Sequence, residues 1–287
     1  MKMVLFVSSE VGYEIAKHTL SRVTVPIVVL DSNDPCKNEI KLLSNRPVYI
    51  ESADLNEQYG LLKKEKAEIF VLGWWPYILP KRIISLATKA CLNCHPSYLP
   101  FSRGKHYYFW NFVDEVPAGA SIHIVDEQID HGPICFQSTF ETSWEDNAFS
   151  MVKKSRDSLV ALYKQHFDEI TSLTFAQHPN DTKSGKIHFA KELRENTKID
   201  LEGTYKAKQL LNILRGCAGF PKNWAYFDDH GIQYEVSVEI RKKLIVCSQN
   251  FWSTFCNLEP IGAYGETLSF LIIIKRASSL TPKNNDA

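Results

Sequence analysis

Asparagine and histidine side chains lie close together at the end of one apolar stretch of the sequence. Asn93 and His95 are two residues apart, and the loop segment 96–100 follows them directly. On an extended strand, residues two apart point to the same side. Histidine is the side chain best matched to proton transfer near neutral pH. Asparagine can donate a hydrogen bond to a developing oxyanion without ionising. The pair therefore predicts proton transfer beside an oxyanion donor.

A carboxylate downstream could complete such a site. Asp130 lies in a turn between two predicted strands, and Gly132 permits tight backbone geometry there. A carboxylate in this position could orient a histidine or stabilise its protonated form. The candidate catalytic residues are therefore Asn93, His95 and Asp130.

The first half of the chain alternates short apolar runs with helical patterns, which predicts an α/β fold with a mostly parallel sheet. Ligands of such sheets bind beyond the C-terminal ends of the strands. The predicted strands are 3–7, 26–30, 48–50, 69–73 and 90–94, with helices at 11–20, 39–43, 55–64 and 83–87.

The second half has a different pattern. Strands are expected at 119–125 and 134–140, followed by a helix over 147–170 and, farther on, a small β-rich appendage with one helix at 204–215 and strands at 225–227, 233–240, 244–247 and 268–274. The expected division is a catalytic domain over 1–176, a linker over 177–203, a C-terminal region over 204–277 and a disordered tail over 278–287.

Composition is that of an ordinary globular protein, with 44% hydrophobic and 23% charged residues in a chain of 287. Lys+Arg and Asp+Glu both number 33, so nothing predicts a nucleic-acid partner. No run approaches the roughly 20 apolar residues of a membrane span, and the first apolar run is too short for a leader. Seven cysteines without a framework spacing predict reduced thiols in the cytoplasm.

Cys91 and Cys94 form a C-x-x-C pair that could suggest a zinc or redox site. A structural zinc site needs a second ligand pair at similar spacing, and none follows. A redox pair usually opens a helix, whereas this one lies in a predicted strand. Two small buried thiols and no metal are expected.

Several pieces in order resemble the folate-dependent formyltransferase family over roughly residues 1–170. They are the run N-C-H-P-S-Y-L-P at 93–100, then Arg103-Gly104, Trp110, Ser121-Ile122-His123 and Ile129-Asp130-x-Gly132. The resemblance implies a Rossmann-like formyltransferase domain that uses N10-formyltetrahydrofolate as co-substrate.

The resemblance also implies roles for the candidate residues. An amine would attack the formyl carbon, and Asn93 with protonated His95 would stabilise the oxyanion. His95 would move the amine proton, and Asp130 would hold His95.

For the folate, the resemblance points to the loop 73–80 before the catalytic strand, closed by the turn 125–130. The implied cofactor-binding residues are Trp75, Tyr77, Ile78, Leu79 and Asp126. Packing remains an equal alternative for the tryptophans of this loop.

Substrate contacts are expected from two parts of the chain. Ser8, Ser9 and Lys105 are candidates in the first domain, with Lys105 expected to meet a phosphate. Phe220 and Tyr226 could stack a nucleobase, although packing in a domain or dimer core is the favoured explanation of these aromatics. Arg103 is expected to support its loop and His123 to be structural.

Comparison with the members of this family narrows the choice of acceptor amine. Glycinamide ribonucleotide transformylase has a glycine-rich loop after the first strand, which is missing here, and formyltetrahydrofolate deformylase carries an N-terminal regulatory domain, which is not expected. Residues 200–287 carry ten Lys/Arg against nine Asp/Glu, or 10 − 9 = +1, too little for a phosphate-backbone binder.

Nucleotide-sugar N-formyltransferases resemble the chain best. They imply a homodimer acting on a dTDP-linked 3- or 4-amino-dideoxyhexose destined for surface polysaccharide such as O-antigen. Methionyl-tRNA formyltransferase is the alternative enzyme. A catalytically dead nucleotide-sugar-binding module is the non-enzyme alternative, against which the intact set of Asn93, His95 and Asp130 argues.

Overall fold

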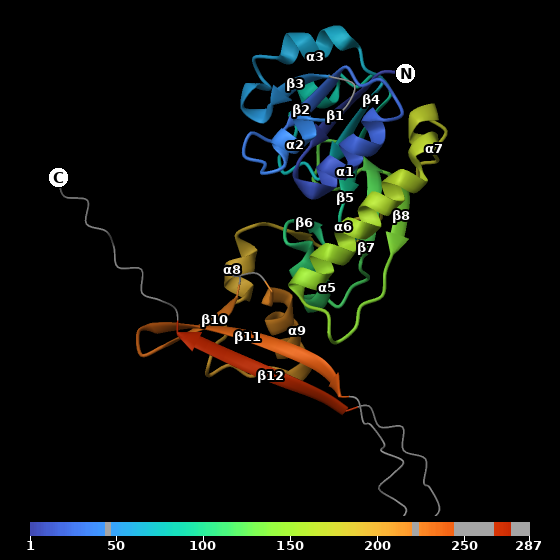
Figure 1. Ribbon diagram of the computed structural model, residues 1–287. Coiled ribbons are helices and arrows are strands. Elements are labelled where there is room, and N and C mark those ends of the chain that lie inside the picture. Colours follow the sequence, from blue (N-terminus) through green and yellow to red (C-terminus); the bar gives the residue numbers. More distant parts are fainter. Residues whose placement is uncertain (44–46, 220–223, 244–266, 277–287) are drawn as a thin grey trace, which may run out of the picture. The chain divides into compact units, whose positions relative to one another are not determined.

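The computed structural model describes residues 1–43, 47–219, 224–243 and 267–276 of the chain (Figure 1). The chain divides into two compact units. The first consists of Met1–Glu141 and Ser150–Leu193, and the second of Thr142–Phe149 and Arg194–Ala287. Each unit has its own sheet.

The first unit contains a sheet of seven strands in the order β3-β2-β1-β4-β5-β7-β8. The five strands from β3 to β5 in this order are parallel, and β7 and β8 join antiparallel. This arrangement confirms the mostly parallel α/β fold expected from the sequence. The strands are β1 (Met3–Val7), β2 (Ile27–Leu30), β3 (Val48–Glu51), β4 (Ile69–Gly73), β5 (Ala90–His95), β7 (Gly119–Ile124) and β8 (Ile134–Thr139).

Helices lie on both faces of this sheet, so a central strand has no solvent-facing side. All five residues of β1 are buried. Leu5 packs in one core cluster with Ile15 of α1, whereas Phe6 packs in a second with Leu62 of α3. The helices are α1 (Ser9–Leu20), α2 (Lys37–Lys41), α3 (Tyr59–Glu65), α4 (Lys81–Ile84), α5 (Tyr107–Val113), α6 (Ala148–Gln165) and α7 (Phe167–Ser172), with a 3-10 turn η1 (Ser52–Asp54).

The segment expected to be a linker is structured. It carries β9 (Ile187–His188), which pairs in parallel with β6 (Arg103–Gly104), and α8 (Glu192–Asn196). Two-residue strands are too short to show a hydrophobic period, so sequence patterning does not detect them. The helix expected over 147–170 is two helices in the structure. The first, α6, ends at Gln165, and the second, α7, begins at Phe167.

The second unit contains α9 (Ala207–Cys217) and an antiparallel sheet in the order β10-β11-β12. The strands are β10 (Ala225–Asp229), β11 (Ile232–Lys243) and β12 (Thr267–Arg276). Val236, Val238 and Ile240 alternate along β11 and are buried, as expected for a sheet with one covered face. The expected strand 244–247 and the tail 278–287 lie outside the described residues.

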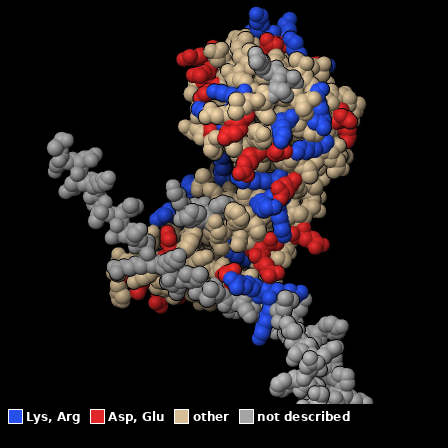
Figure 2. Space-filling view, in the orientation of Figure 1, with Lys and Arg blue, Asp and Glu red and all other residues tan. Residues whose placement is uncertain are grey.

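Charged side chains of both signs are interspersed on the visible face of the first unit (Figure 2). Several form pairs, such as Lys164 Nζ with Glu14 Oε2 at 2.7 Å. Within the described part of the chain, every helix is too short or too polar to cross a membrane.

Candidate active site

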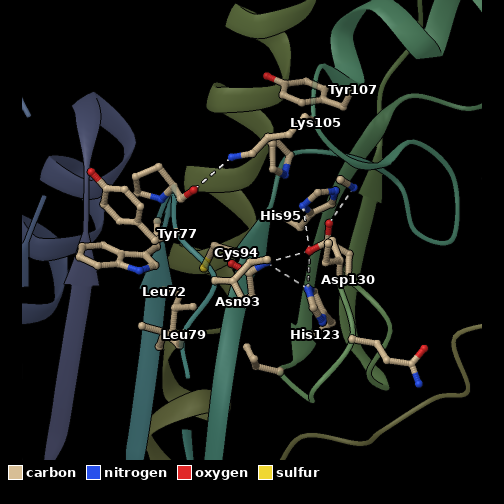
Figure 3. A pocket seen from close by; sticks show the side chains of 18 of the residues that line it. Leu72, Tyr77, Leu79, Asn93, Cys94, His95, Lys105, Tyr107, His123 and Asp130 are labelled. Atoms are coloured by element: carbon tan, nitrogen blue, oxygen red, sulfur yellow. Dashed lines mark hydrogen bonds and ion pairs between the residues drawn. The ribbon is translucent and has the colours of Figure 1, made fainter. Parts of the chain in front are cut away.

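The structure brings the three predicted catalytic residues together at one edge of the sheet (Figure 3). Asn93 and His95 stand at the C-terminal end of β5, and Asp130 comes from the turn between β7 and β8. Asp130 Oδ1 lies 3.3 Å from Asn93 Nδ2 and 3.5 Å from His95 Nδ1. The predicted set is therefore one contiguous cluster.

A fourth member, His123, completes the cluster. Strand β7 pairs antiparallel with β5 and sets His123 opposite Asn93. Its Nδ1 lies 2.7 Å from the Ile124 carbonyl oxygen, to which it donates. Its Nε2 lies 3.1 Å from Asn93 Nδ2. His123 was expected to be structural, and only the pairing of β5 with β7 shows that it faces the site.

The Asn93 amide is already engaged inside this cluster. Its two N–H groups point to His123 Nε2 and to Asp130 Oδ1. Rotating the amide would bring its oxygen against the carboxylate, so the observed orientation is the favourable one. To donate to an oxyanion, Asn93 must give up one of these two bonds.

Asp130 is ionised despite its burial. Burial opposes the charge, but His95, which is protonated in the acidic range where this carboxyl titrates, the His123 ring and the Gly104 N–H together hold the pKa of Asp130 well below its ordinary value. The Gly104 N–H donates to Oδ2 at 2.9 Å. The backbone of Asp130 has φ 45°, a left-handed conformation that non-glycine residues adopt rarely and that concentrates at functional sites.

His95 is neutral at rest. It is 5% exposed, and burial lowers its pKa below the ordinary value, opposed by the Asp130 carboxylate. Its Nε2 is buried and has no hydrogen-bond partner among the described residues. From the sequence, a protonated ring was expected beside an oxyanion. In the resting state the ring is neutral, because a desolvated imidazole resists charge, and the expected protonation belongs to the reaction itself.

The cluster lines a cavity of about 510 Å³, within the range of small-molecule sites. All five predicted cofactor-binding residues line it as well. Its walls come from the loop after β4, the end of β5, the segment from β6 into α5, the β7–β8 turn and β9. They include Leu72, Trp74, Trp75, Pro76, Tyr77, Ile78, Leu79, Lys105, His106, Tyr107, Val125, Asp126, Gln128, His188, Phe189 and Ala190.

The loop after β4 is hydrogen-bonded to the residue that follows β2. Tyr77 donates its hydroxyl hydrogen to Asp31 Oδ1 at 2.8 Å. Trp75 lies edge-on to Phe6 and to Tyr77, so it both packs against the core and lines the cavity. Packing and pocket lining are thus not exclusive for this residue.

Asp126 shapes the opposite wall. Its Oδ2 lies 2.6 Å from His131 Nδ1, and its Oδ1 accepts the Gln128 N–H at 2.9 Å. These contacts fix the β7–β8 turn that carries Asp130.

Ser8 and Ser9 do not reach the cavity. The Ser8 hydroxyl donates to Asp31 Oδ2 at 3.4 Å, and the Ser9 N–H donates to Asp34 Oδ2 at 2.6 Å. Two carboxylates next to these serines disfavour phosphate there. Lys105 does line the cavity, where its Nζ donates to the Pro76 carbonyl at 3.1 Å.

The remaining predicted residues serve other contacts. Arg103 donates to the Thr182 and Gly185 carbonyls, at 3.3 and 3.5 Å, and so holds its loop to the distant segment that precedes β9. Tyr226 belongs to the second unit, where the Arg194 guanidinium lies 4.8 Å from its ring centre. Phe220 lies outside the described residues.

The C-x-x-C pair is buried, with Cys91 4% and Cys94 2% exposed. Burial raises the pKa of each thiol to about 12, so neither is a thiolate at neutral pH. In the described part of the chain, no three His, Cys, Asp or Glu side chains are grouped so as to hold a metal ion.

The sequence is similar to formyltransferases of two kinds. It is 27% identical over 174 residues to the methionyl-tRNA formyltransferase of Thermodesulfovibrio yellowstonii, covering 60% of this chain and 55% of that protein. It is 28% identical over 139 residues to the dTDP-4-amino-4,6-dideoxyglucose formyltransferase of Mycobacterium bovis, covering 48% and 59%. The chain thus spans less than two thirds of the length of these relatives.

A solved structure shares the fold. The N-formyltransferase from Helicobacter canadensis, in complex with folinic acid and dTDP-3-aminofucose, superposes with a TM-score of 0.66 at 17% identity, covering 83% of this chain and 88% of that one.

Two family descriptions match the chain directly. "N-formyltransferase dimerization C-terminal domain" matches residues 192–242, and "Formyl transferase" matches residues 15–166, which include the whole cluster of Asn93, His95, His123 and Asp130. The chain belongs to the formyl transferase family.

Proposed function

We propose that this protein transfers a formyl group from N10-formyltetrahydrofolate to the amine of a dTDP-linked 3- or 4-amino-dideoxyhexose. The observation that carries the proposal is the buried, neutral His95 with an unpartnered Nε2, next to the ionised Asp130 on the cavity wall. Such a pair accepts a proton from an attacking amine and stabilises the cation that results.

The cavity fits a flat heteroaromatic ligand such as the pterin of folate. Leu72, Leu79 and Val125 give it an apolar wall, and polar residues such as Asn93, Gln128 and Asp130 line it as well. When bound, the co-substrate supplies the electrophilic formyl carbon. The cavity is lined by residues of the loop 73–80, which was expected to bind the folate, and this supports the assignment.

The chain's own groups can move one proton through the reaction. As the amine nitrogen bonds to the formyl carbon, His95 Nε2 takes the amine proton. Asp130, 3.5 Å from the other ring nitrogen, stabilises the imidazolium. His95 then returns the proton to the departing folate nitrogen, so that the ring ends neutral. Asn93 donates to the developing oxygen charge once its amide leaves Asp130.

The sugar acceptor is favoured by the C-terminal part of the chain. Its match to a dimerization domain of N-formyltransferases supports a homodimer formed through residues 192–242, and one relative is named for a dTDP-4-amino sugar. We place the reaction in the cytoplasm and its product in surface polysaccharide such as O-antigen.

Methionyl-tRNA is the second candidate acceptor, because a relative of that activity aligns over 174 residues. The near-neutral balance of residues 200–287, 10 − 9 = +1, weighs against it, since tRNA binding requires contacts to many phosphates.

The test is release of tetrahydrofolate by the purified protein, measured with a panel of dTDP-3-amino and dTDP-4-amino sugars, with initiator methionyl-tRNA and with no acceptor. The variant His95→Asn removes the base. His230→Asn, a matched change at an exposed histidine whose side chain is 94% exposed, is the control.

Release that depends on one amino sugar, survives in His230→Asn and is lost in His95→Asn would support the proposal and identify the amine. Formylation of methionyl-tRNA alone would replace the sugar acceptor and leave the catalytic set standing. Binding of a dTDP-amino sugar without any turnover would overturn the enzyme proposal in favour of a binding module.

A further inference from the structure

One short segment, residues 178–190, touches Asp130 from its backbone side. Asn180 Nδ2 lies 3.1 Å from the carbonyl oxygen of Asp130, 3.1 Å from that of His131 and 3.3 Å from that of Gly132. A single amide nitrogen therefore lies within hydrogen-bonding distance of three consecutive carbonyl oxygens of the turn that carries Asp130. His178, two residues before Asn180, also pairs with Ile134, where this turn enters β8.

The same segment also controls the donor that meets the Asp130 carboxylate. Gly104, whose N–H donates to Oδ2, belongs to β6, which is held by β9 of the segment. The Lys105 N–H donates to the His188 carbonyl at 2.9 Å, and the Arg103 N–H to the Lys186 carbonyl at 3.3 Å. A Cβ on Gly104 would lie 2.2 Å from the His188 oxygen, so the two strands are in close contact.

Strand β9 is itself firmly anchored. The His188 ring lies stacked on Trp110 at 3.7 Å with an interplanar angle of 5°. Its Nε2 is 2.8 Å from Asp114 Oδ2, and its Nδ1 is 3.1 Å from Glu192 Oε2. A ring fixed on both nitrogens and one face gives the segment a rigid end next to β6.

We propose that residues 178–190 act as a strap that positions the Asp130 carboxylate against His95, with Asn180 as the positioning residue. The inference deepens the proposed function and rests on it for the role of Asp130. Asp130 adopts a left-handed conformation in a turn, which surrounding structure must maintain. Asn180 fixes the backbone of that turn while β6 and β9 fix the donor to its carboxylate.

The test measures where the carboxylate lies, through the pKa of His95. Asn180→Leu keeps a side chain of similar size without donors or charge, and Asn180→Ala is a second variant that adds no bulk. The pKa of His95 is read by NMR titration of ring-labelled histidine, with the signal assigned from His95→Asn. Asp130→Asn gives the value for a missing carboxylate, and Lys183→Ala, an exposed change within the strap, is the control.

The charged and titratable groups that influence His95 are Asp130, His123 and Lys105. Only the first is contacted by Asn180, so a change at Asn180 reports on the carboxylate. We expect both Asn180 variants to lower the pKa of His95 toward the value in Asp130→Asn, and Lys183→Ala to leave it unchanged. In the formyl-transfer assay we expect kcat to fall, by up to about 10²-fold, at unchanged KM for the folate.

A His95 pKa equal to that of the wild type in both Asn180 variants would overturn the strap. Folded Asn180 variants that keep the wild-type kcat, with an active wild type, would overturn it too. A wild type without formyl transfer would instead overturn the proposed function, and the NMR shift would still decide whether the strap holds the carboxylate.

Discussion

Replacing Asp130 with asparagine tests the electrostatic core of the site. The substitution keeps the shape of the side chain and removes its charge. Because the carboxylate favours the protonated form of His95, its loss lowers the pKa of His95 still further. His95 must be neutral to accept a proton, so the acid limb of kcat/KM should move to lower pH.

The size of the shift follows from the separation of the pair. Two unit charges 3.5 Å apart interact by about 5 kcal/mol at an effective dielectric constant of about 20. That energy corresponds to roughly 3.5 pH units, which is an upper bound because the side chains relax. Opposite charges at this range typically shift a pKa by about 1–3 units, and this is the shift expected here.

The assay is kcat/KM for formyl transfer measured from about pH 4.5 to 9 for the wild type and Asp130→Asn. At neutral pH the rate should fall by about 10²–10⁴-fold, because the imidazolium loses its counter-charge during transfer. Asp157→Asn, which removes an exposed carboxylate from α6, controls for net charge and should keep the wild-type profile.

An acid limb that stays at the wild-type position in Asp130→Asn would refute the reasoning. So would one that moves to higher pH, since that would mean the carboxylate had been suppressing protonation of the base. Either result would show that the group titrating in the rate is not His95 beside Asp130.

Three further predictions test other parts of the site. Gly104→Ala should lower the free energy of unfolding by roughly 2–5 kcal/mol and should also lower kcat, because Gly104 has φ 85° and a new Cβ would collide with the His188 carbonyl. Urea unfolding and measurements of kcat check this. Tyr77→Phe removes the hydrogen bond to Asp31 and should raise KM for the folate a few-fold at constant kcat, as steady-state kinetics would show. His95 has a lowered pKa, so the unfolded chain gains more protons on acidification; between pH 7 and 5 the wild type should lose more unfolding free energy than His95→Asn.

The sheet and the grouping of Asn93, His95 and Asp130 were predictable because their signals are local. Apolar runs bounded by turns indicated the parallel strands, and Asn93 and His95 sit two apart at a strand end. The turn with Asp130 was placed between the correct pair of strands. Each of these inferences needs only spacing and residue type.

The missed features depend on pairing between distant segments. His123 faces the site because β7 pairs antiparallel with β5, and spacing within β7 alone does not show this. Asn180 and β9 contact residues about 50 to 85 positions earlier in the chain. The contacts of Ser8 and Ser9 with Asp31 and Asp34 could not be predicted either, because these carboxylates lie more than 20 residues away in the sequence.

The resting charges of the cluster explain why so many groups surround one carboxylate. With His95 neutral, its charge cannot keep Asp130 ionised before the reaction. That task falls to the backbone N–H group of Gly104, which donates to Asp130 Oδ2 at 2.9 Å. The carboxylate is therefore charged and oriented before the proton arrives, so its stabilisation of the imidazolium needs no reorganisation at that moment. Burial keeps His95 neutral, so that it can accept a proton, and the Gly104 N–H keeps Asp130 ionised, so that it can stabilise the imidazolium. Proton transfer requires both properties.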